Sequence, residues 1–166
     1  STSSNQAALI VTGLPPSIVT PVAPQTAPAG SNVTLAVVAA GSPTLSYQWR
    51  HLGGTIPGAT LSSLTLVDVQ AAQAGLYDVV IANSVNTITS NAALLTVTPA
   101  APTIVTQPLT QSATGGTVVT LSVVARGTAP LSYQWRKGTV DVLNGGVVSG
   151  ATTSTLTLTG VTANEA

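Results

Sequence analysis

The sequence Leu45-Ser46-Tyr47-Gln48-Trp49-Arg50 occurs a second time as Leu131-Ser132-Tyr133-Gln134-Trp135-Arg136. Both tryptophans of the chain and two of its three tyrosines lie in these two stretches. In each copy the apolar residues Leu, Tyr and Trp alternate with Ser, Gln and Arg, which is the pattern of a β-strand with one buried face. We therefore expect each copy to be the central strand of a β-sandwich.

The two copies belong to a longer internal repeat. Tyr47 and Tyr133 are 86 residues apart, and the same spacing relates many other positions. Residues 7–12 precede residues 93–98 by this spacing and share their alternating pattern, which indicates the last strand of a preceding repeat. Further pairs at this spacing are Gly30 and Gly116, Leu35 and Leu121, Val37 and Val123, Gly41 and Gly127, and Ile18 and Ile104.

This repeat defines the expected domain organisation of an all-β chain of tandem Greek-key sandwiches. We expect residues 1–13 to hold the last strand of a preceding repeat and the start of a joint. The prolines in Gly13-Leu14-Pro15-Pro16 and in Pro99-Ala100-Ala101-Pro102 indicate a semi-rigid joint before the strands of each repeat. Residues 14–98 are expected to form a complete sandwich whose final strand runs over residues 87–98. Residues 99–166 are expected to form a sandwich without its last two strands.

The second repeat departs from the first at two places. Gly150 of its Gly-Ala-Thr motif follows Gly58 by 92 residues rather than 86, so six residues are inserted between Lys137 and Ser149. A longer hairpin is the simplest expectation for this insertion. At its end, residues 164–166 align with residues 72–74, just before the strand that we expect from Gly75 onward.

Two explanations are open for the strands that the second repeat lacks. The first is that the sequence belongs to a longer array of repeats in which these strands follow. The second is strand donation, in which residues 5–12 of one subunit complete the second domain of a neighbour, with Ala7, Leu9 and Val11 as the donated strand. Donation accounts for a last-type strand at the start of the sequence but leaves the penultimate strand unexplained.

The composition excludes several classes of function. Charged residues make up 5% of the chain, against about 25% in an ordinary soluble domain, and the net charge is zero. A chain of this kind offers no electrostatic attraction to nucleic acid or to an anionic membrane, and no apolar run approaches the ~20 residues of a membrane span. With no cysteine, neither a disulfide nor a thiolate metal site can form. A surface without charge favours side-by-side assembly or a glycan coat, because like-charge repulsion is missing.

The repeat resembles an immunoglobulin-like domain of the intermediate type, in the disulfide-free form found in bacterial surface proteins. The resemblance rests on the Gly30 turn, the Leu35 and Val37 strand, Tyr47-Gln48-Trp49-Arg50, Gly58-Ala59-Thr60, Leu64 to Leu66, and Gly75-Leu76-Tyr77 through Asn83. It implies that Trp49 is the core tryptophan and that the hydroxyl of Tyr77 bonds back to nearby backbone. It also implies that Val37 and Val79 replace the usual inter-sheet cystine. The expected core residues are Val37, Tyr47, Trp49, Tyr77 and Val79 in the first repeat and Val123, Tyr133 and Trp135 in the second.

No constellation of catalytic or metal-binding residues is recognisable. His51 is the only histidine, which excludes a catalytic triad or a multi-histidine metal site within this chain. The acidic residues are scattered, and Asp141 with Asn144 in the inserted segment is the pair nearest to a site. We therefore expect no cofactor and no metal. The four acidic residues are Asp68, Asp78, Asp141 and Glu165.

The basic residues and the glycosylation sequon also favour structural roles. Arg50, Arg136 and Lys137 follow the core strand, where a long side chain can lie over apolar surface with its charged end in water. Asn32-Val33-Thr34 is the one N-glycosylation sequon, although O-linked sugar on the many Thr and Ser residues is the better expectation for a bacterial chain.

These observations predict a protein that is not an enzyme. We expect an extracellular or cell-surface structural or adhesive protein of a bacterium, whose tandem immunoglobulin-like repeats form a stalk, sheath or filament. Its expected partners are other such repeats or copies of itself, with a glycan as a further candidate. The alternative is a spacer or carbohydrate-binding accessory module of a large secreted enzyme, for which exposed coplanar aromatic side chains are the expected signature.

Overall fold

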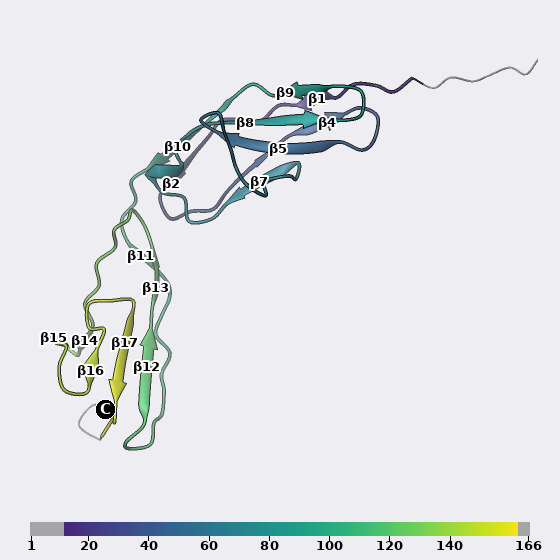
Figure 1. Cartoon of the computed structure of the whole chain (residues 1–166). Helices are drawn as coiled ribbons and strands as arrows, with labels where there is room; N and C mark the ends of the chain where they lie inside the picture. Colours follow the sequence, from purple (N-terminus) through teal and green to yellow (C-terminus); the bar gives the residue numbers. More distant parts are fainter. Residues whose placement is uncertain (1–11, 163–166) are drawn as a thin grey trace, which may run out of the picture. The chain divides into compact units, whose positions relative to one another are not determined.

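The computed structural model describes residues 12–162, and its regular secondary structure is almost entirely β-strand (Figure 1). The one helical element among these residues is the short 3-10 turn η1 (Ala71–Gln73). The described chain divides into two compact units, of which the first comprises residues 12–26, 33–66 and 73–96 and the second comprises residues 27–32, 67–72 and 97–162. The units thus follow the two sequence repeats, except that two turns of the first repeat are grouped with the second unit.

The strands of the first repeat form two layers. The larger sheet has the order β2-β10-β8-β5-β6, with β9 also paired to β8. In the other layer β1 pairs with β4 and β3 pairs with β7, and only Val37 separates β3 from β4. The strands are β1 (Ser17–Thr20), β2 (Gln25–Pro28), β3 (Val33–Ala36), β4 (Val38–Ala40), β5 (Ser46–His51), β6 (Gly54–Thr55), β7 (Ser63–Leu66), β8 (Gly75–Ala82), β9 (Thr87–Thr89) and β10 (Ala93–Thr98).

The core of the first repeat lies between β5, β8 and the strands that face them. β5 and β8 are antiparallel, with Trp49 opposite Val79 and Tyr47 opposite Ile81. Trp49, Val79 and Ile81 have no exposed surface, and Leu35 of β3 is 1% exposed. Alternate residues of β8 point inward, as the period of two in the sequence predicts.

The final strand of the first repeat is split in two. Ser90 interrupts the expected strand over residues 87–98, which becomes β9 and β10. The Ser90 hydroxyl accepts a hydrogen bond from the Val79 amide at 3.0 Å, and the Ser90 amide donates to the Val79 carbonyl at 3.0 Å. Because the buried serine uses a side-chain oxygen in place of a backbone partner, the ladder shifts at this point.

The second repeat keeps part of this topology. β11 pairs with β13 and β12 pairs with β17, in the registers that β1 with β4 and β3 with β7 have in the first repeat. Its strands are β11 (Thr103–Thr106), β12 (Val118–Ser122), β13 (Val124–Arg126), β14 (Arg136–Lys137), β15 (Val140–Asp141), β16 (Val148–Ser149) and β17 (Thr155–Thr159).

The six inserted residues do not lengthen the hairpin, which corrects the expectation from the sequence. β14 and β15 correspond to the end of β5 and to β6 at the unchanged spacing of 86 residues. The extra residues follow β15 and include β16. This strand pairs with β17 on the edge away from β12. An extra short strand can form there because the edge of β17 is free to accept it, and so the insertion adds backbone hydrogen bonds instead of a longer loop.

Candidate interaction face

The loop before β8 is held by Tyr77, whose hydroxyl donates a hydrogen bond to the Gln73 carbonyl at 2.8 Å. Tyr77 is 1% exposed, and its burial raises the pKa of its hydroxyl above the ordinary value. Gly75 starts the strand with φ +134°, and a Cβ at this position would lie 2.9 Å from Cδ2 of Leu52. Backbone conformation and space therefore both favour glycine at position 75.

Charged and ring side chains on β5 and β8 join the two strands. Nε of Arg50 donates to Oδ1 of Asp78 at 2.6 Å, Nη2 donates to Oδ2 at 3.0 Å, and this hydrogen bonding raises the pKa of Arg50. The His51 ring stacks on Tyr77 with 4.4 Å between ring centroids, and Nε2 of His51 lies 3.1 Å from the Ala74 carbonyl oxygen. These contacts hold the two strands together.

A second ion pair joins two charged residues of the second repeat. Arg136 pairs with Asp141 at 2.7 Å across the β14–β15 hairpin, whereas the equivalent Arg50 pairs with β8. The Asn144 amide oxygen accepts the Ala151 amide at 2.8 Å and orders the inserted segment. Within residues 12–162 no three His, Cys, Asp or Glu side chains are close enough to hold a metal ion. Glu165 lies outside the described residues.

The expected core residues separate into two groups. Val37, Trp49, Tyr77 and Val79 are buried, and Tyr47 is half-buried. Val123, Tyr133 and Trp135 of the second repeat are half-buried instead of sealed, because no described strand covers them. The proposed donor residues Ala7, Leu9 and Val11 lie outside the described residues.

The uncovered side chains of the second repeat line two neighbouring hollows. The larger has a volume of about 430 Å³ and is lined by Val123, Leu131, Tyr133 and Trp135 among others. The other has a volume of about 380 Å³, and Pro108 lines both. We call the surface that lines these two hollows the open face.

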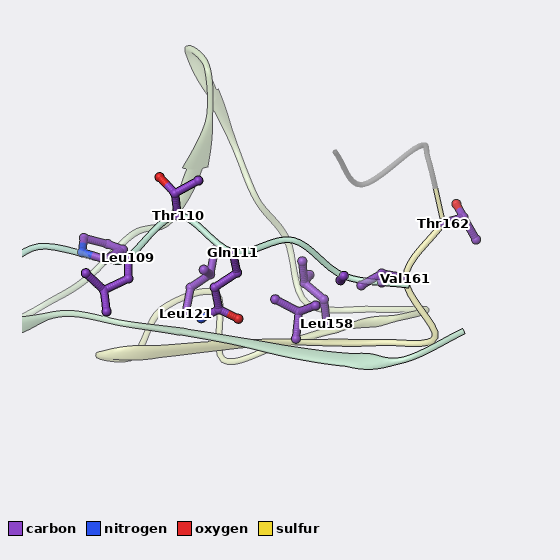
Figure 2. Close-up of a pocket in the computed structure, with 10 residues that line it drawn as sticks. Leu109, Thr110, Gln111, Leu121, Leu158, Val161 and Thr162 are labelled. Carbon is purple, nitrogen blue, oxygen red and sulfur yellow. The ribbon is translucent and has the colours of Figure 1, made fainter. Parts of the chain in front are cut away.

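Figure 2 shows the smaller hollow, which three segments of the second repeat line. Leu109 and Gln111 come from the segment that precedes β12, Leu121 comes from β12, and Leu158 belongs to β17. Val161 completes the hollow at the end of the described chain. Its lining is thus mainly aliphatic and also includes the amide of Gln111 and two threonines.

A repeated set of hydrogen bonds fastens each proline-containing joint to the repeat that follows it. The Leu14 amide donates to the Ser42 hydroxyl at 2.8 Å, and the Ser42 amide donates to the Leu14 carbonyl at 3.0 Å. In the second repeat, Ala100 and Thr128 form the same two bonds at 2.8 and 3.0 Å. Asn83 adds a third bond in the first repeat, from Nδ2 to the Leu14 carbonyl at 2.7 Å.

These joint contacts were not predicted from the sequence. The sequence signal for these contacts is a hydroxyl residue directly after Gly41 and again directly after Gly127, at the spacing of the repeat. A hydroxyl side chain can pair with an exposed backbone amide and so fix the chain at a turn.

None of the described residues belongs to a helix with the length and apolar character of a membrane span.

Comparisons with known proteins agree with this fold. A family model described as "Immunoglobulin domain" matches residues 15–83. The protein "IgLON family member 5" of Homo sapiens is 32% identical over 130 residues, which are 77% of this chain and 38% of that protein. The chain thus spans 38% of the length of the curated relatives that it matches.

Two solved structures illustrate the structural similarity. One is "Chimeric titin Z1Z2 functionalized with a KLER exogenous peptide from decorin", with 29% identity, a TM-score of 0.49, and coverage of 52% of this chain and 98% of that one. The other is "Crystal structure of Dpr2 Ig1-Ig2 in complex with DIP-Theta Ig1-Ig3", with 27% identity, a TM-score of 0.47, and coverage of 92% and 58%. The family match and the strand pairing together show an all-β, immunoglobulin-like fold.

Proposed function

We propose that this chain is part of an extracellular structural or adhesive protein in which immunoglobulin-like repeats follow one another as a stalk, sheath or filament. The domain boundaries proposed from the sequence, at residues 13/14 and 98/99, place one joint before each repeat. The bacterial origin implied by the resemblance stays a prediction. So does completion of a repeat by strands from a neighbouring repeat or subunit.

The repeated fastening of the joints is the observation that carries this proposal. Ser42 and Thr128 bind Leu14 and Ala100 through the same pair of bonds, at the repeat spacing. A joint that is bonded to the following domain limits rotation of the chain at that point, because two backbone groups of the joint are fixed. A stalk or filament needs such limits at every joint, whereas a flexible tether between independent binding domains does not.

The near absence of charge supports assembly of many copies. The chain has a single lysine, and natural proteins commonly guard exposed strand edges with lysine. Exposed apolar side chains of the first repeat, such as Leu61 (71%) and Leu52 (68%), add to a surface with little repulsion between copies. We therefore expect the chain to associate side by side.

Electron microscopy of the purified chain over a range of concentrations tests this function. We expect filaments or ordered bundles to appear as concentration rises. Their diameter should be constant, because the repeats that build them are of one size. Dispersed single particles at the highest concentration would contradict the proposal. The double variant Leu52→Lys with Leu61→Lys is the matched control, because two added charges should suppress association while the buried core is unchanged.

A carbohydrate-binding accessory module is the second candidate function. It is favoured by Tyr133 and Trp135, two half-buried aromatic side chains that line the same hollow and are available to stack on a sugar ring. A glycan array probed with the full chain distinguishes the candidates. Binding that Trp135→Ala abolishes would favour the accessory module, and an array without any signal would leave the structural role as the explanation.

A further inference from the structure

Two turns of the first repeat are joined to each other by backbone hydrogen bonds. The Gly30 amide donates to the Val69 carbonyl at 2.8 Å, and the Val69 amide donates to the Ser31 carbonyl at 2.9 Å. We call residues 27–32 and 67–72 together the corner, and both segments belong to the second compact unit. The paired turns are a regular part of the repeat, because the second repeat forms the same two bonds. These bonds join Gly116, Thr117 and Val161 at 2.8 and 3.1 Å.

The side-chain amide of Gln70 binds the corner to a turn of the second repeat that lies in the same compact unit. Its Nε2 donates to the Gly127 carbonyl at 3.1 Å, and its Oε1 accepts the Ala129 amide at 3.0 Å. Gln70 is half-buried, so these two bonds are partly shielded from water. Two bonds from one planar amide group fix the direction of the side chain as well as its distance from residues 127–129.

The backbone of the corner touches this turn at Gly30. Gly30 and Gly127 are both buried, and a Cβ at Gly30 would lie 2.6 Å from the Gly127 amide nitrogen. Gly116 is the equivalent residue of the second repeat, with φ +86° against +87° for Gly30. It is exposed, and no atom of the described residues lies within 4 Å of a Cβ built there. Both positions thus favour glycine by backbone conformation, and Gly30 in addition has no room for a side chain.

The turn that the corner contacts is also bound to the joint before the second repeat. The Ala100 amide donates to the Thr128 hydroxyl, and the Thr128 amide donates to the Ala100 carbonyl. A Cβ at Gly127 would lie 3.0 Å from the Ala101 carbonyl oxygen, so the joint passes directly beside the turn. Residues 127–129 are therefore bound by the joint and by the corner, through two hydrogen bonds each.

We infer that the corner is a docking site for residues 127–129 and that this contact couples the stability of the two repeats. This inference rests on the proposed function and names the surface that one repeat offers to the next. Unfolding of the second repeat removes both partners of the Gln70 amide and uncovers Gly30. In a chain of repeats, a contact of this kind lets each repeat stabilise its neighbour.

The contact also selects the turn that it accepts. It uses a carbonyl at the position of Gly127 and a backbone N–H at the position of Ala129. In the first repeat Pro43 stands at the position of Ala129, and proline has no N–H. A side chain like Gln70 would form one of the two bonds at that turn. The corner thus fits the turn Gly-Thr-Ala of the second repeat better than the turn Gly-Ser-Pro of the first.

A substitution in the core of the second repeat tests the coupling in the full chain. Leu156 is 5% exposed and belongs to β17, outside the corner. We expect Leu156→Ala to speed hydrogen exchange of the Gly30 and Val69 amides by roughly tenfold or more, because the turn that holds the corner opens more often. Exchange in β8 of the first repeat should be unchanged. NMR measures these rates one amide at a time.

Two glutamine variants test the side-chain part of the contact. Gln70→Ala should speed exchange of the Thr128 amide by roughly fivefold, although Gln70 does not bind this amide, because the turn loses two hydrogen bonds. In the Gln70→Ala background, Leu156→Ala should no longer change the exchange of Gly30. Gln25→Ala is the control, because it removes a side-chain bond to the Thr34 carbonyl within the first repeat.

Two glycine variants separate the contact from backbone strain. Gly30→Ala and Gly116→Ala place alanine at nearly the same φ, and the new Cβ meets the turn at Gly30 but not at Gly116. We expect Gly30→Ala to speed exchange of the Thr128 and Ala129 amides and Gly116→Ala to leave both unchanged. If Gly30→Ala does not fold, Gln70→Asn replaces it, because its amide is one methylene too short to reach both backbone groups.

Three results would overturn the inference. Unchanged exchange of Gly30 and Val69 in Leu156→Ala would show that the corner is stable without the second repeat. Equal exchange of Thr128 in Gln70→Ala and Gln25→Ala would remove the docking role of Gln70. Equal effects of the two glycine variants would show that the close approach at Gly30 has no part in it. A coupled chain that forms no filaments would overturn the proposed function alone.

Discussion

At the scale of single residues, Trp49 and Trp135 are equivalent in sequence and differ in what covers them. Both indoles donate a hydrogen bond to a backbone carbonyl at 2.9 Å. Trp49 has no exposed surface because β8 lies beside β5, whereas Trp135 is half-buried. The environment of a core side chain is thus decided by strands that are distant in sequence.

This difference predicts unequal effects of the same substitution. Trp49→Ala should lower the free energy of unfolding by about 3–5 kcal/mol, because a buried ring is lost and a cavity remains. Trp135→Ala should lower it by only roughly 1–2 kcal/mol, because the half-buried ring loses less contact. Urea unfolding followed by circular dichroism measures both values. Equal losses would show that the second repeat seals its tryptophan as the first does.

Tyr77→Phe tests the bond that fixes the loop before β8. The variant removes the hydroxyl that donates to the Gln73 carbonyl, and we expect a loss of about 0.5–1.5 kcal/mol in the free energy of unfolding. Urea unfolding at pH 7 measures this loss. Tyr47→Phe on the neighbouring strand is the control for removing a tyrosine hydroxyl from a half-buried position. An equal loss of unfolding free energy in Tyr47→Phe would contradict a stabilising role for the bond from Tyr77 to the Gln73 carbonyl.

The pKa of Tyr77 predicts a loss of stability in base. Burial favours the neutral hydroxyl, so the folded pKa lies above the ordinary value of 10.0. Between these two values the unfolded chain binds fewer protons than the folded chain, and the free energy of unfolding therefore falls as pH rises above about 10. Below that pH this contribution is constant. Urea unfolding of the parent chain and Tyr77→Phe from pH 8 to 11 should show a smaller slope for the variant.

At the scale of elements, β8 is the strand on which the first sandwich depends. It pairs with β5, β9 and β10, and its start is set by the close approach of Gly75 to Leu52 and His51. The Arg50 and Asp78 pair and the His51 and Tyr77 stack all join β5 to β8. Without such a strand, residues 131–135 of the second repeat do not form a ladder.

Gly75→Ala should destabilise the first repeat by about 1–3 kcal/mol. An alanine there needs a φ of +134° and a Cβ 2.9 Å from Leu52, and both requirements oppose the folded state. Gly54→Ala in β6 is the control, because its Cβ would lie 3.4 Å from the nearest atom, the His51 carbonyl oxygen. Thermal unfolding compares the two. A larger drop in Tm for Gly54→Ala would show that this account of the β8 start is incorrect.

The sequence was sufficient to predict the strands that carry alternating apolar residues, and insufficient where hydrogen bonds decide. The alternation of apolar residues in β8 predicted a strand, because a period of two buries one face of the strand. The 86-residue spacing predicted that the second repeat contains equivalent strands. The break at Ser90 and the short strand β16 depend on bonds to distant backbone, which no local pattern shows. The joint bonds of Ser42 and Thr128 were missed for the same reason.

At the scale of the whole molecule, the chain combines a sealed repeat with one that presents an open face. The sealed repeat shows what the open one lacks, because both use the same residues at the same spacing. Each repeat binds the joint before its strands through the same pair of hydrogen bonds. The proposed structural role follows from this organisation and needs no catalytic group.

Loosening a joint should change the local dynamics without unfolding a repeat. Asn83→Ala removes the bonds from Nδ2 to the Leu14 carbonyl and to the Ser42 carbonyl, the latter at 3.0 Å. It also removes the two bonds that Oδ1 accepts from the backbone amides of the following turn. We expect faster backbone hydrogen exchange at residues 14–16 and 42 and unchanged exchange in β8, because the core contacts remain. Asn86→Ala, in the turn that follows, is the control. Equal exchange at the joint in the parent and in Asn83→Ala would contradict its role.

The most direct test of the account is the exchange of the two indole N–H protons with solvent, measured separately by NMR in the full chain. The account predicts slow exchange for Trp49, which is sealed between two sheets, and exchange faster by orders of magnitude for Trp135 on the open face. Slow exchange of both protons at equal rates in a monomeric chain would contradict it.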